Sequence, residues 1–372
     1  MPKKSDVLIV GAGAAGIGLG ATLRHFHIEN FTIIERYEIG ASFRRWPKEM
    51  RFISPSFPSN GFGLLDLNAV TLGTSPAFSL QNEHPTGSEY AQYLERVAQH
   101  FELPIQTGIE VEDVEVLPND EGFIVATSEG DFQTRFLIWA AGEFQYPNLN
   151  PFPGGEHCLH NSQITSWKDL DGDSFFVVGG YESGIDAAVN LAQVGKRVRL
   201  LDASGAWKED SPDPSLSLSP YTLTRLRDIM PTFRVNLVHA AVEKVEKQED
   251  GFIIHDSDGQ AWTSQTPPIL ATGFKGSTSH LPYLFDAHED GSPRLTEHDE
   301  SIVAPGLFLV GPTIRHQGII FCFIYKFRQR FAIVAHEIAN RLGLDVQTSV
   351  EAYRANGMYL DDLSCCDDSC AC

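Results

Sequence analysis

The sequence is poor in basic residues. Its 372 residues include 28 Lys and Arg against 49 Asp and Glu, a formal net charge of −21 at pH 7. Such a charge repels phosphate backbones and anionic lipid, so we expect neither nucleic acid nor a membrane as a partner. The partner we expect is a small-molecule substrate or a disulfide, and a homodimer is left open.

Long apolar runs are also missing. No stretch reaches the roughly 20 residues that cross a bilayer, and charged residues interrupt the nearest candidate, 318–335, which predicts a packed helix instead. The N-terminus leads directly into a strand-like run and does not resemble a signal peptide. We therefore expect a cytoplasmic protein, long enough for two or three layered domains.

A first glycine-rich turn follows an apolar run at residues 6–10. Gly11 permits the tight turn, Gly13 lets the backbone approach a pyrophosphate, and Gly16 lets the next helix pack closely. The amides of that helix, from Ala14 and Ala15 onward, favour a phosphate. The next strand-like run ends at Glu35, a carboxylate suited to ribose hydroxyls. An N-terminal site of this kind, followed by a second one, predicts bound FAD.

A second turn of the same kind lies 168 residues further on and predicts a nicotinamide nucleotide site. Tyr181 stands at its middle glycine position, so a phenol ring lies where pyrophosphate normally meets backbone. This leaves three alternatives: the nucleotide binds further out than usual, the Tyr181 ring moves aside when the nucleotide binds, or the site binds a nicotinamide nucleotide weakly. Asp202 ends the next strand and favours NADH over NADPH, although Lys208 nearby weakens that inference. The expected binding residues are Gly179, Gly180, Tyr181, Glu182, Ser183 and Gly184.

The order of patterns predicts an α/β protein of two dinucleotide-binding, Rossmann-like domains, the NAD(P)-type domain being inserted in the FAD domain. We expect strands near 109–117, 122–128 and 132–140, a helix over 88–101 capped by Ser88, and a helix over about 318–342. Small-residue turns ending in Gly142 and Gly273, and a last strand before Gly311, are expected to meet the cofactors. The expected boundaries are 1–150 and 276–345 for the FAD domain, 151–275 for the insert, and 346–372 for a C-terminal extension.

The chain resembles short bacterial flavin-containing monooxygenase-like proteins of the CzcO type over roughly residues 5–345. The resemblance is carried by the first glycine turn and by segments 42–46, 50–55, 84–86 and 159–162. It implies that Arg44 or Trp46 lies near FAD. Independently, Gln317 and Gly318 lie where the last helix of the FAD domain is expected to begin, so we expect them to approach the flavin. The chain departs from the pattern in a stretched element at 152–160, and in Pro312 where an aspartate commonly follows Gly311.

A second resemblance is to thioredoxin-reductase-like proteins, including bacillithiol disulfide reductases. The glycine turns and the Ala-Thr-Gly segment at 271–273 carry it. The Cys-x-x-Cys pair of thioredoxin reductase is absent, and Ala15 stands where bacillithiol reductases have a cysteine. No thiol is therefore placed at the flavin by sequence.

Six cysteines occur, and four of them fall in the last eight residues: Cys365, Cys366, Cys370 and Cys372. This tail is interpreted as a catalytic dithiol that relays electrons from the flavin, as a thiolate site for a soft metal, or as an end without a role. Acidic neighbours raise thiol pKa values, which argues against a fast nucleophile. Cys158 and Cys322 are expected to be buried small apolar residues.

These patterns together predict an FAD-dependent NAD(P)H oxidoreductase that resembles a flavin monooxygenase and acts on a small molecule. One alternative is a thiol-disulfide or metal reductase that uses the tail cysteines. Another is a flavin-bound redox sensor or metal-binding protein. The cofactors expected are FAD with NADH or NADPH, and the flavin itself would supply the redox step.

Overall fold

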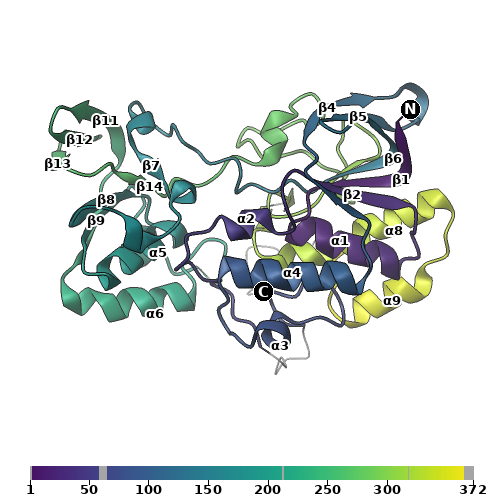
Figure 1. Ribbon diagram of the computed structural model, residues 1–372, viewed down its shortest axis with the longest axis horizontal. Coiled ribbons are helices and arrows are strands. Elements are labelled where there is room, and N and C mark those ends of the chain that lie inside the picture. The colour runs from purple at the N-terminus through teal and green to yellow at the C-terminus, as the bar shows by residue number, and fades with distance from the viewer. Residues whose placement is uncertain (1, 58–64, 212, 317, 364–372) are drawn as a thin grey trace. The chain divides into compact units, whose positions relative to one another are not determined.

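The structure is a computed structural model that describes residues 2–57, 65–211, 213–316 and 318–363 (Figure 1). It divides into two compact units. Unit 1 takes the described parts of 1–44, 55–143 and 276–363, and unit 2 takes 45–54 and 144–275. These limits differ from the expected boundaries at 45–54 and 144–150, which lie in unit 2.

Unit 1 is built on one mixed sheet in the order β3-β2-β1-β6-β5-β4, with β15 also paired to β6. β1, β2, β3, β6 and β15 run parallel to one another, whereas β5 pairs antiparallel with β6 and with β4. β5 pairs with the first half of β6 and β15 with the second half. The strands are β1 Lys3–Val10, β2 Phe31–Glu35, β3 Ile105–Thr107, β4 Val111–Val116, β5 Phe123–Thr127, β6 Phe132–Trp139 and β15 Leu307–Leu309.

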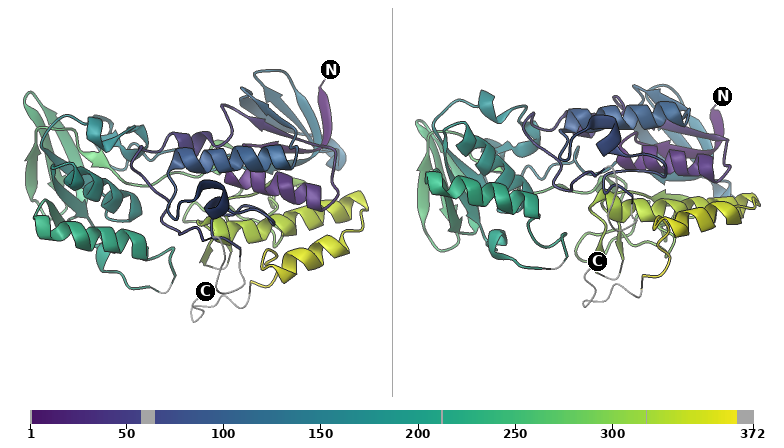
Figure 2. Two further views of the ribbon diagram at one scale, coloured as in Figure 1. Left: turned by 60° about the horizontal axis from the view of Figure 1, so that its bottom comes forward. Right: turned by 90° about the horizontal axis from the view of Figure 1, so that it is seen from below.

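Helices pack on this sheet because its central strands are apolar on both faces. Val7, Leu8 and Ile9 of β1 are all fully buried. α1 contacts both α4 and α8, and the views of Figure 2 show α1 and α8 running side by side. The helices of unit 1 are α1 Ala14–His25, α2 Ala41–Arg44, α3 Pro76–Leu80, α4 Gly87–His100, α7 Ile324–Phe327, α8 Phe331–Leu342 and α9 Gln347–Ala355.

Unit 2 repeats the design on a smaller scale. Its five-stranded sheet is parallel throughout, in the order β10-β9-β8-β14-β7, and a three-stranded antiparallel sheet, β11-β12-β13, accompanies it. α5 packs on this parallel sheet and against α6. The elements are β7 Leu159–His160, β8 Ser174–Val178, α5 Glu182–Gln193, β9 Arg197–Asp202, α6 Pro220–Ile229, β10 Val235–His239, β11 Val242–Gln248, β12 Gly251–Asp256, β13 Ala261–Ser264 and β14 Ile269–Leu270.

Two local predictions are wrong. The helix expected from about 318 is preceded by a hairpin of β16 Arg315–His316 and β17 Ile319–Ile320, because Gly318 turns the chain with φ of +88°. Helical structure begins only at Ile324. The cap of α4 is Thr86 and not Ser88: the Thr86 hydroxyl accepts from the Glu89 amide, and the Glu89 carboxylate accepts from the Thr86 amide, which is a capping box.

No described helix is long and apolar enough to cross a membrane.

Candidate functional site

The first glycine turn is closed by backbone contacts that only glycine allows. Gly11 has φ of +109°, and a β-carbon there would lie 2.5 Å from the Ala140 carbonyl oxygen. A β-carbon on Gly16 would lie 1.9 Å from the Gly11 oxygen. The strand, the turn and the start of α1 therefore form one tight unit whose shape depends on these two glycines.

The N-terminus of α1 presents backbone amides that no described protein group satisfies. Gly13 caps the helix with no side-chain hydrogen bond, and the amides of Ala14, Ala15 and Gly16 have no acceptor anywhere in the described residues. All three residues are buried. A β-carbon on Gly13 would meet nothing within 4 Å. Buried, unpartnered amides beside open space are what a bound phosphate satisfies.

Glu35 lies beside this turn, as the sequence predicted. Its carboxylate is buried, and it accepts the Ala12 amide at 2.8 Å and the Tyr37 amide at 3.0 Å. These bonds hold the carboxylate at the end of β2, next to the second residue of the turn. The group is in place to accept ribose hydroxyls from a nucleotide whose phosphate is at α1.

Two further strand ends of unit 1 bring residues to the same sheet edge. β6 leads into Gly142 and Glu143, and β15 leads into Gly311, where a β-carbon would lie 3.4 Å from the Ala15 β-carbon. Burial raises the pKa of Glu143, and the positive charge of Arg315 opposes that shift. The ends of parallel strands are where ligands of such sheets bind.

The second glycine turn copies the first. Gly179 has φ of +107°, and a β-carbon there would lie 2.3 Å from the Ala271 oxygen. A β-carbon on Gly184 would lie 1.9 Å from the Gly179 oxygen. The amides of Glu182, Ser183 and Gly184 at the start of α5 again have no acceptor within the described chain. Glu182, Ser183 and Gly184 thus stand where Ala14, Ala15 and Gly16 stand in unit 1.

The side chain of Tyr181 is hydrogen-bonded to a neighbouring loop through its hydroxyl group. Its hydroxyl lies 2.8 Å from the Ser217 carbonyl oxygen and 3.1 Å from that of Pro214. The Glu182 carboxylate also turns toward this region, where it accepts from the Ser219 amide and the Thr222 hydroxyl at the start of α6. The first residues of α5 are therefore bonded to the chain that follows β9.

The oxygens of Asp202 are used by the protein itself. They accept the amides of Gly180, Ser204, Gly205 and Ala206 and the Ser204 hydroxyl. Burial acts to raise the pKa of Asp202, but the bonds from Ser204 and the backbone amides outweigh it and hold the pKa below its usual range. A ribose hydroxyl would compete with five protein donors for these oxygens, whereas the lowered pKa keeps the negative charge that would repel a 2′-phosphate. Trp207 also approaches the turn: a β-carbon on Gly180 would lie 2.7 Å from its ring.

The remaining expected site residues have the following places in the structure. The guanidinium of Arg44 pairs with Glu38 and Glu95. Trp46 belongs to unit 2, where its ring packs 5.0 Å from that of Phe52. Gly273, with φ of +76°, follows β14 by the same interval that separates Gly142 from β6. Gln317 and the cysteines at 365, 366, 370 and 372 lie outside the described residues.

Sequence inspection missed a buried ionic group in unit 1. Asp299 pairs with Arg330, and it also lies 2.5 Å from the Nε2 atom of His316. Nothing local signals these contacts, because they join residues 17 and 31 positions apart. Glu143 was missed as well, although its place directly after the first small-residue turn was the available signal.

Comparison with known proteins agrees with this geometry. The profile of the pyridine nucleotide-disulphide oxidoreductases matches residues 8–311. The chain belongs to this family. FAD and NAD(P)H are typical cofactors of the family, and the first turn fits FAD because it offers unpartnered amides, open space at Gly13 and the Glu35 carboxylate.

Curated relatives include an uncharacterized oxidoreductase CzcO of Bacillus velezensis, 32% identical over 208 residues, which are 54% of this chain and 54% of the relative. The chain thus spans about half the length of the CzcO relatives it matches. Bacilliredoxin reductase Bdr of Bacillus subtilis is 24% identical over 348 residues, covering 91% of this chain and 98% of the relative.

Solved structures show the same fold. The bacillithiol disulfide reductase Bdr of Staphylococcus aureus has a TM-score of 0.73 at 20% identity, covering 91% of this chain and 99% of that one. A flavin-containing monooxygenase from Stenotrophomonas maltophilia has a TM-score of 0.71 at 17% identity, with the same coverage. The predicted α/β fold of two dinucleotide-binding domains is therefore confirmed.

Proposed function

We propose that this protein is an FAD-dependent oxidoreductase that takes electrons from NADH or NADPH and resembles a flavin monooxygenase in acting on a small molecule. The observation that carries the proposal is the N-terminus of α1, where three buried amides lack an acceptor among the described residues and Gly13 leaves open space. These features match a pyrophosphate held by backbone.

The roles of the chain's own residues follow from their positions. The amides of Ala14, Ala15 and Gly16 hold the pyrophosphate, and Glu35 accepts the ribose hydroxyls. The matching amides of Glu182, Ser183 and Gly184 hold the phosphates of the nicotinamide nucleotide. FAD, once bound, supplies the two-electron chemistry, while the protein positions it and excludes competing groups.

A monooxygenase-like activity is favoured over a thiol-disulfide reductase activity, because Ala15 leaves the first glycine turn without a thiol. Of the cysteines in the described residues, Cys158 belongs to unit 2, where burial foremost and Glu156 second raise its pKa to about 12. A thiol with that pKa is a poor nucleophile at neutral pH. Cys322, which lies in unit 1, and the C-terminal cysteines are then left for a relay from the flavin.

Three measurements test the proposal. The purified protein should be yellow, should lose its 450 nm band when NADH or NADPH is added without oxygen, and should regain that band with oxygen. A colourless protein that takes up no added FAD contradicts the proposal.

The thiol-disulfide alternative is tested by ending the chain after Leu363. If the C-terminal cysteines relay electrons, the shortened protein keeps flavin reduction and loses turnover with a disulfide. If the monooxygenase-like proposal holds, it consumes NAD(P)H and oxygen at the full-length rate. A metal-binding tail predicts a third result, in which both activities persist and only thiolate–metal absorbance is lost.

A further inference from the structure

The order of strands fixes the direction in which a dinucleotide crosses unit 1. Glu35 ends β2 on one side of β1, while β6 and then β15 lie on the other side. A nucleotide with its phosphate at α1 and its adenosine ribose at Glu35 therefore extends its other half over the ends of β6 and β15. In FAD that half carries the flavin.

His316 lies five residues beyond Gly311, on the hairpin strand that follows the end of β15. Its Nε2 atom is 2.5 Å from the Oδ1 atom of Asp299. Because a carboxylate accepts, Nε2 carries a hydrogen in this pair. Nδ1 is then the free nitrogen, and no described residue provides it with a hydrogen bond. The side chain remains 10% exposed, so solvent can restore a proton to it.

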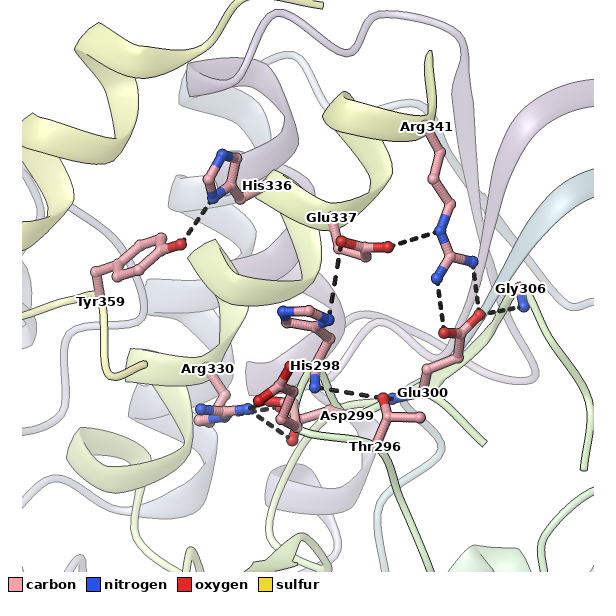
Figure 3. Close-up of polar contacts among 11 residues, drawn as sticks. Thr296, His298, Asp299, Glu300, Gly306, Arg330, His336, Glu337, Arg341 and Tyr359 are labelled. Atoms are coloured by element: carbon pink, nitrogen blue, oxygen red, sulfur yellow. Dashed lines mark hydrogen bonds and ion pairs between the residues drawn. The ribbon is translucent and has the colours of Figure 1, made fainter. Parts of the chain in front are cut away.

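Asp299 is held rigidly behind this imidazole. Its side chain and that of Arg330 are both fully buried, with Nε to Oδ2 at 2.9 Å and Nη2 to Oδ1 at 3.1 Å (Figure 3). The Leu309 amide donates to the Asp299 carbonyl at 2.9 Å, which ties the loop to β15. Arg330 also donates to the carbonyl of Leu360. The orientation of His316 is thus set by a carboxylate that cannot turn away.

We propose that His316 is the proton donor at the flavin end of unit 1, with Asp299 as its positioning residue. The acceptor is an oxygen compound, dioxygen or a quinone. It takes a hydride equivalent, two electrons and one proton, from the reduced cofactor. His316, protonated at Nδ1 as well as at Nε2, gives its Nδ1 proton to the oxygen anion so formed and becomes the neutral imidazole. The products are hydrogen peroxide or a hydroquinone, and solvent returns a proton to Nδ1. The proposal rests on the proposed function, because it requires FAD at α1.

The charges around His316 form two opposed pairs. Asp299 is balanced by Arg330 behind it. Arg315, the neighbour of His316 on β16, donates to the carbonyls of Pro312 and Ile314 and faces the charge of Glu143. Within the described residues, the imidazole contacts one carboxylate directly, that of Asp299.

The test uses the full-length, FAD-loaded protein reduced by light or dithionite, so that it does not depend on nicotinamide binding. Reoxidation is followed at 450 nm with dioxygen and separately with 1,4-benzoquinone, across pH, for wild type and His316→Gln. General acids contribute about 10²–10⁴-fold, so we expect a loss of at least about 100-fold at neutral pH. If His316 donates the proton, the wild-type rate should fall as pH rises, and this fall should be absent from the variant. A lower reoxidation rate of His316→Gln with both acceptors supports the proposal. A lower rate with only one acceptor identifies that acceptor as the one that needs the proton.

Two controls separate proton donation from a structural role. His336→Gln removes another partly buried imidazole of unit 1, one that bonds the Tyr359 hydroxyl at 2.7 Å, and should leave the pH profile unchanged. His316→Ala should recover part of its rate when imidazole is added. Wild-type rates and pH dependence in His316→Gln overturn the proposal.

A second readout does not need turnover. In protein labelled with ¹⁵N-histidine, the imidazole signals absent from His316→Gln identify His316. Adding FAD to the apoprotein should shift those signals and leave the signals of His336 in place. FAD that binds without moving the His316 signals places the flavin elsewhere and also overturns the proposal, whereas failure to bind FAD at all would overturn the proposed function.

Discussion

Gly13 and Tyr181 hold matching positions in the two glycine turns. Each caps the helix that follows, with φ and ψ of −83° and −167° at Gly13 and of −89° and −163° at Tyr181. This conformation is open to any residue, so a glycine at this position provides space and not backbone freedom. The two turns therefore differ in what fills the space beside the unpartnered amides at the start of each helix.

Replacing Gly13 tests the first turn. In Gly13→Leu the side chain enters the space that a pyrophosphate needs, so FAD content should fall to near zero while the fold persists. The contrasting variant is Gly16→Ala, whose β-carbon would lie 1.9 Å from the Gly11 oxygen and should unfold the turn itself. Absorbance at 450 nm and thermal melting distinguish the two. Normal FAD content in Gly13→Leu would show that the pyrophosphate does not lie there.

Replacing Tyr181 tests the second turn. We expect Tyr181→Gly to bind the nicotinamide nucleotide about tenfold more tightly, a gain of about 1.4 kcal/mol, because the ring competes for the pyrophosphate position. Tyr181→Phe keeps the ring and loses only the bonds to Ser217 and Pro214, so its affinity should stay near wild type. The measurement is the flavin reduction rate against nucleotide concentration. Equal affinity in all three proteins would show that the ring is no obstacle.

Arg330 tests the buried ionic group. In Arg330→Ala the Asp299 carboxylate stays buried without its main partner, so the free energy of unfolding should fall by about 3–5 kcal/mol. The control is Arg354→Ala, because the ion pair of Arg354 with Asp361 is half exposed and should contribute at most about 1 kcal/mol. Urea denaturation measures both. A loss below about 1 kcal/mol in Arg330→Ala would contradict the burial and pairing described here.

Cys158 provides a test of local electrostatics. Burial first, and the nearby charge of Glu156 second, raise its pKa to about 12. At pH 8 the thiolate fraction of an ordinary cysteine is about one quarter, whereas the thiolate fraction of a cysteine with a pKa of about 12 is about 10⁻⁴. Iodoacetamide should therefore modify Cys158 about 10³-fold more slowly in the folded protein than in urea. Peptide mass mapping against time measures this, and equal rates would show that the thiol is not held in its neutral form.

Periodicity and turn chemistry predicted the parts of the fold that depend on local sequence. The run at 132–140 became β6, and the paired turns at Gly11 and Gly179 have matching positive φ. The hairpin of β16 and β17 was missed, because its isoleucines and the phenylalanines that follow also fit a helix pattern. Only the left-handed turn at Gly318 separates these alternatives.

The residues of the candidate site likewise fall into those that local sequence could predict and those that it could not. Glu35 could be predicted because its distance from the first turn is set by one helix and one strand. The contacts of Asp299 with His316 and Arg330 could not, because they form only when the loop after residue 296, the hairpin and the last helices pack together. Side chains that come together only through tertiary packing are not separated by any characteristic interval in the sequence, so sequence patterns cannot predict their contact.

The central claim is that unit 1 holds FAD and that NAD(P)H reduces it. The most direct measurement is stopped-flow absorbance of the purified protein without oxygen, with NADH and NADPH in separate experiments. The account predicts a flavin band at 450 nm that bleaches as either nucleotide is raised, and returns when oxygen is admitted. A protein that holds FAD but keeps its 450 nm band at saturating NADH and NADPH would contradict the account.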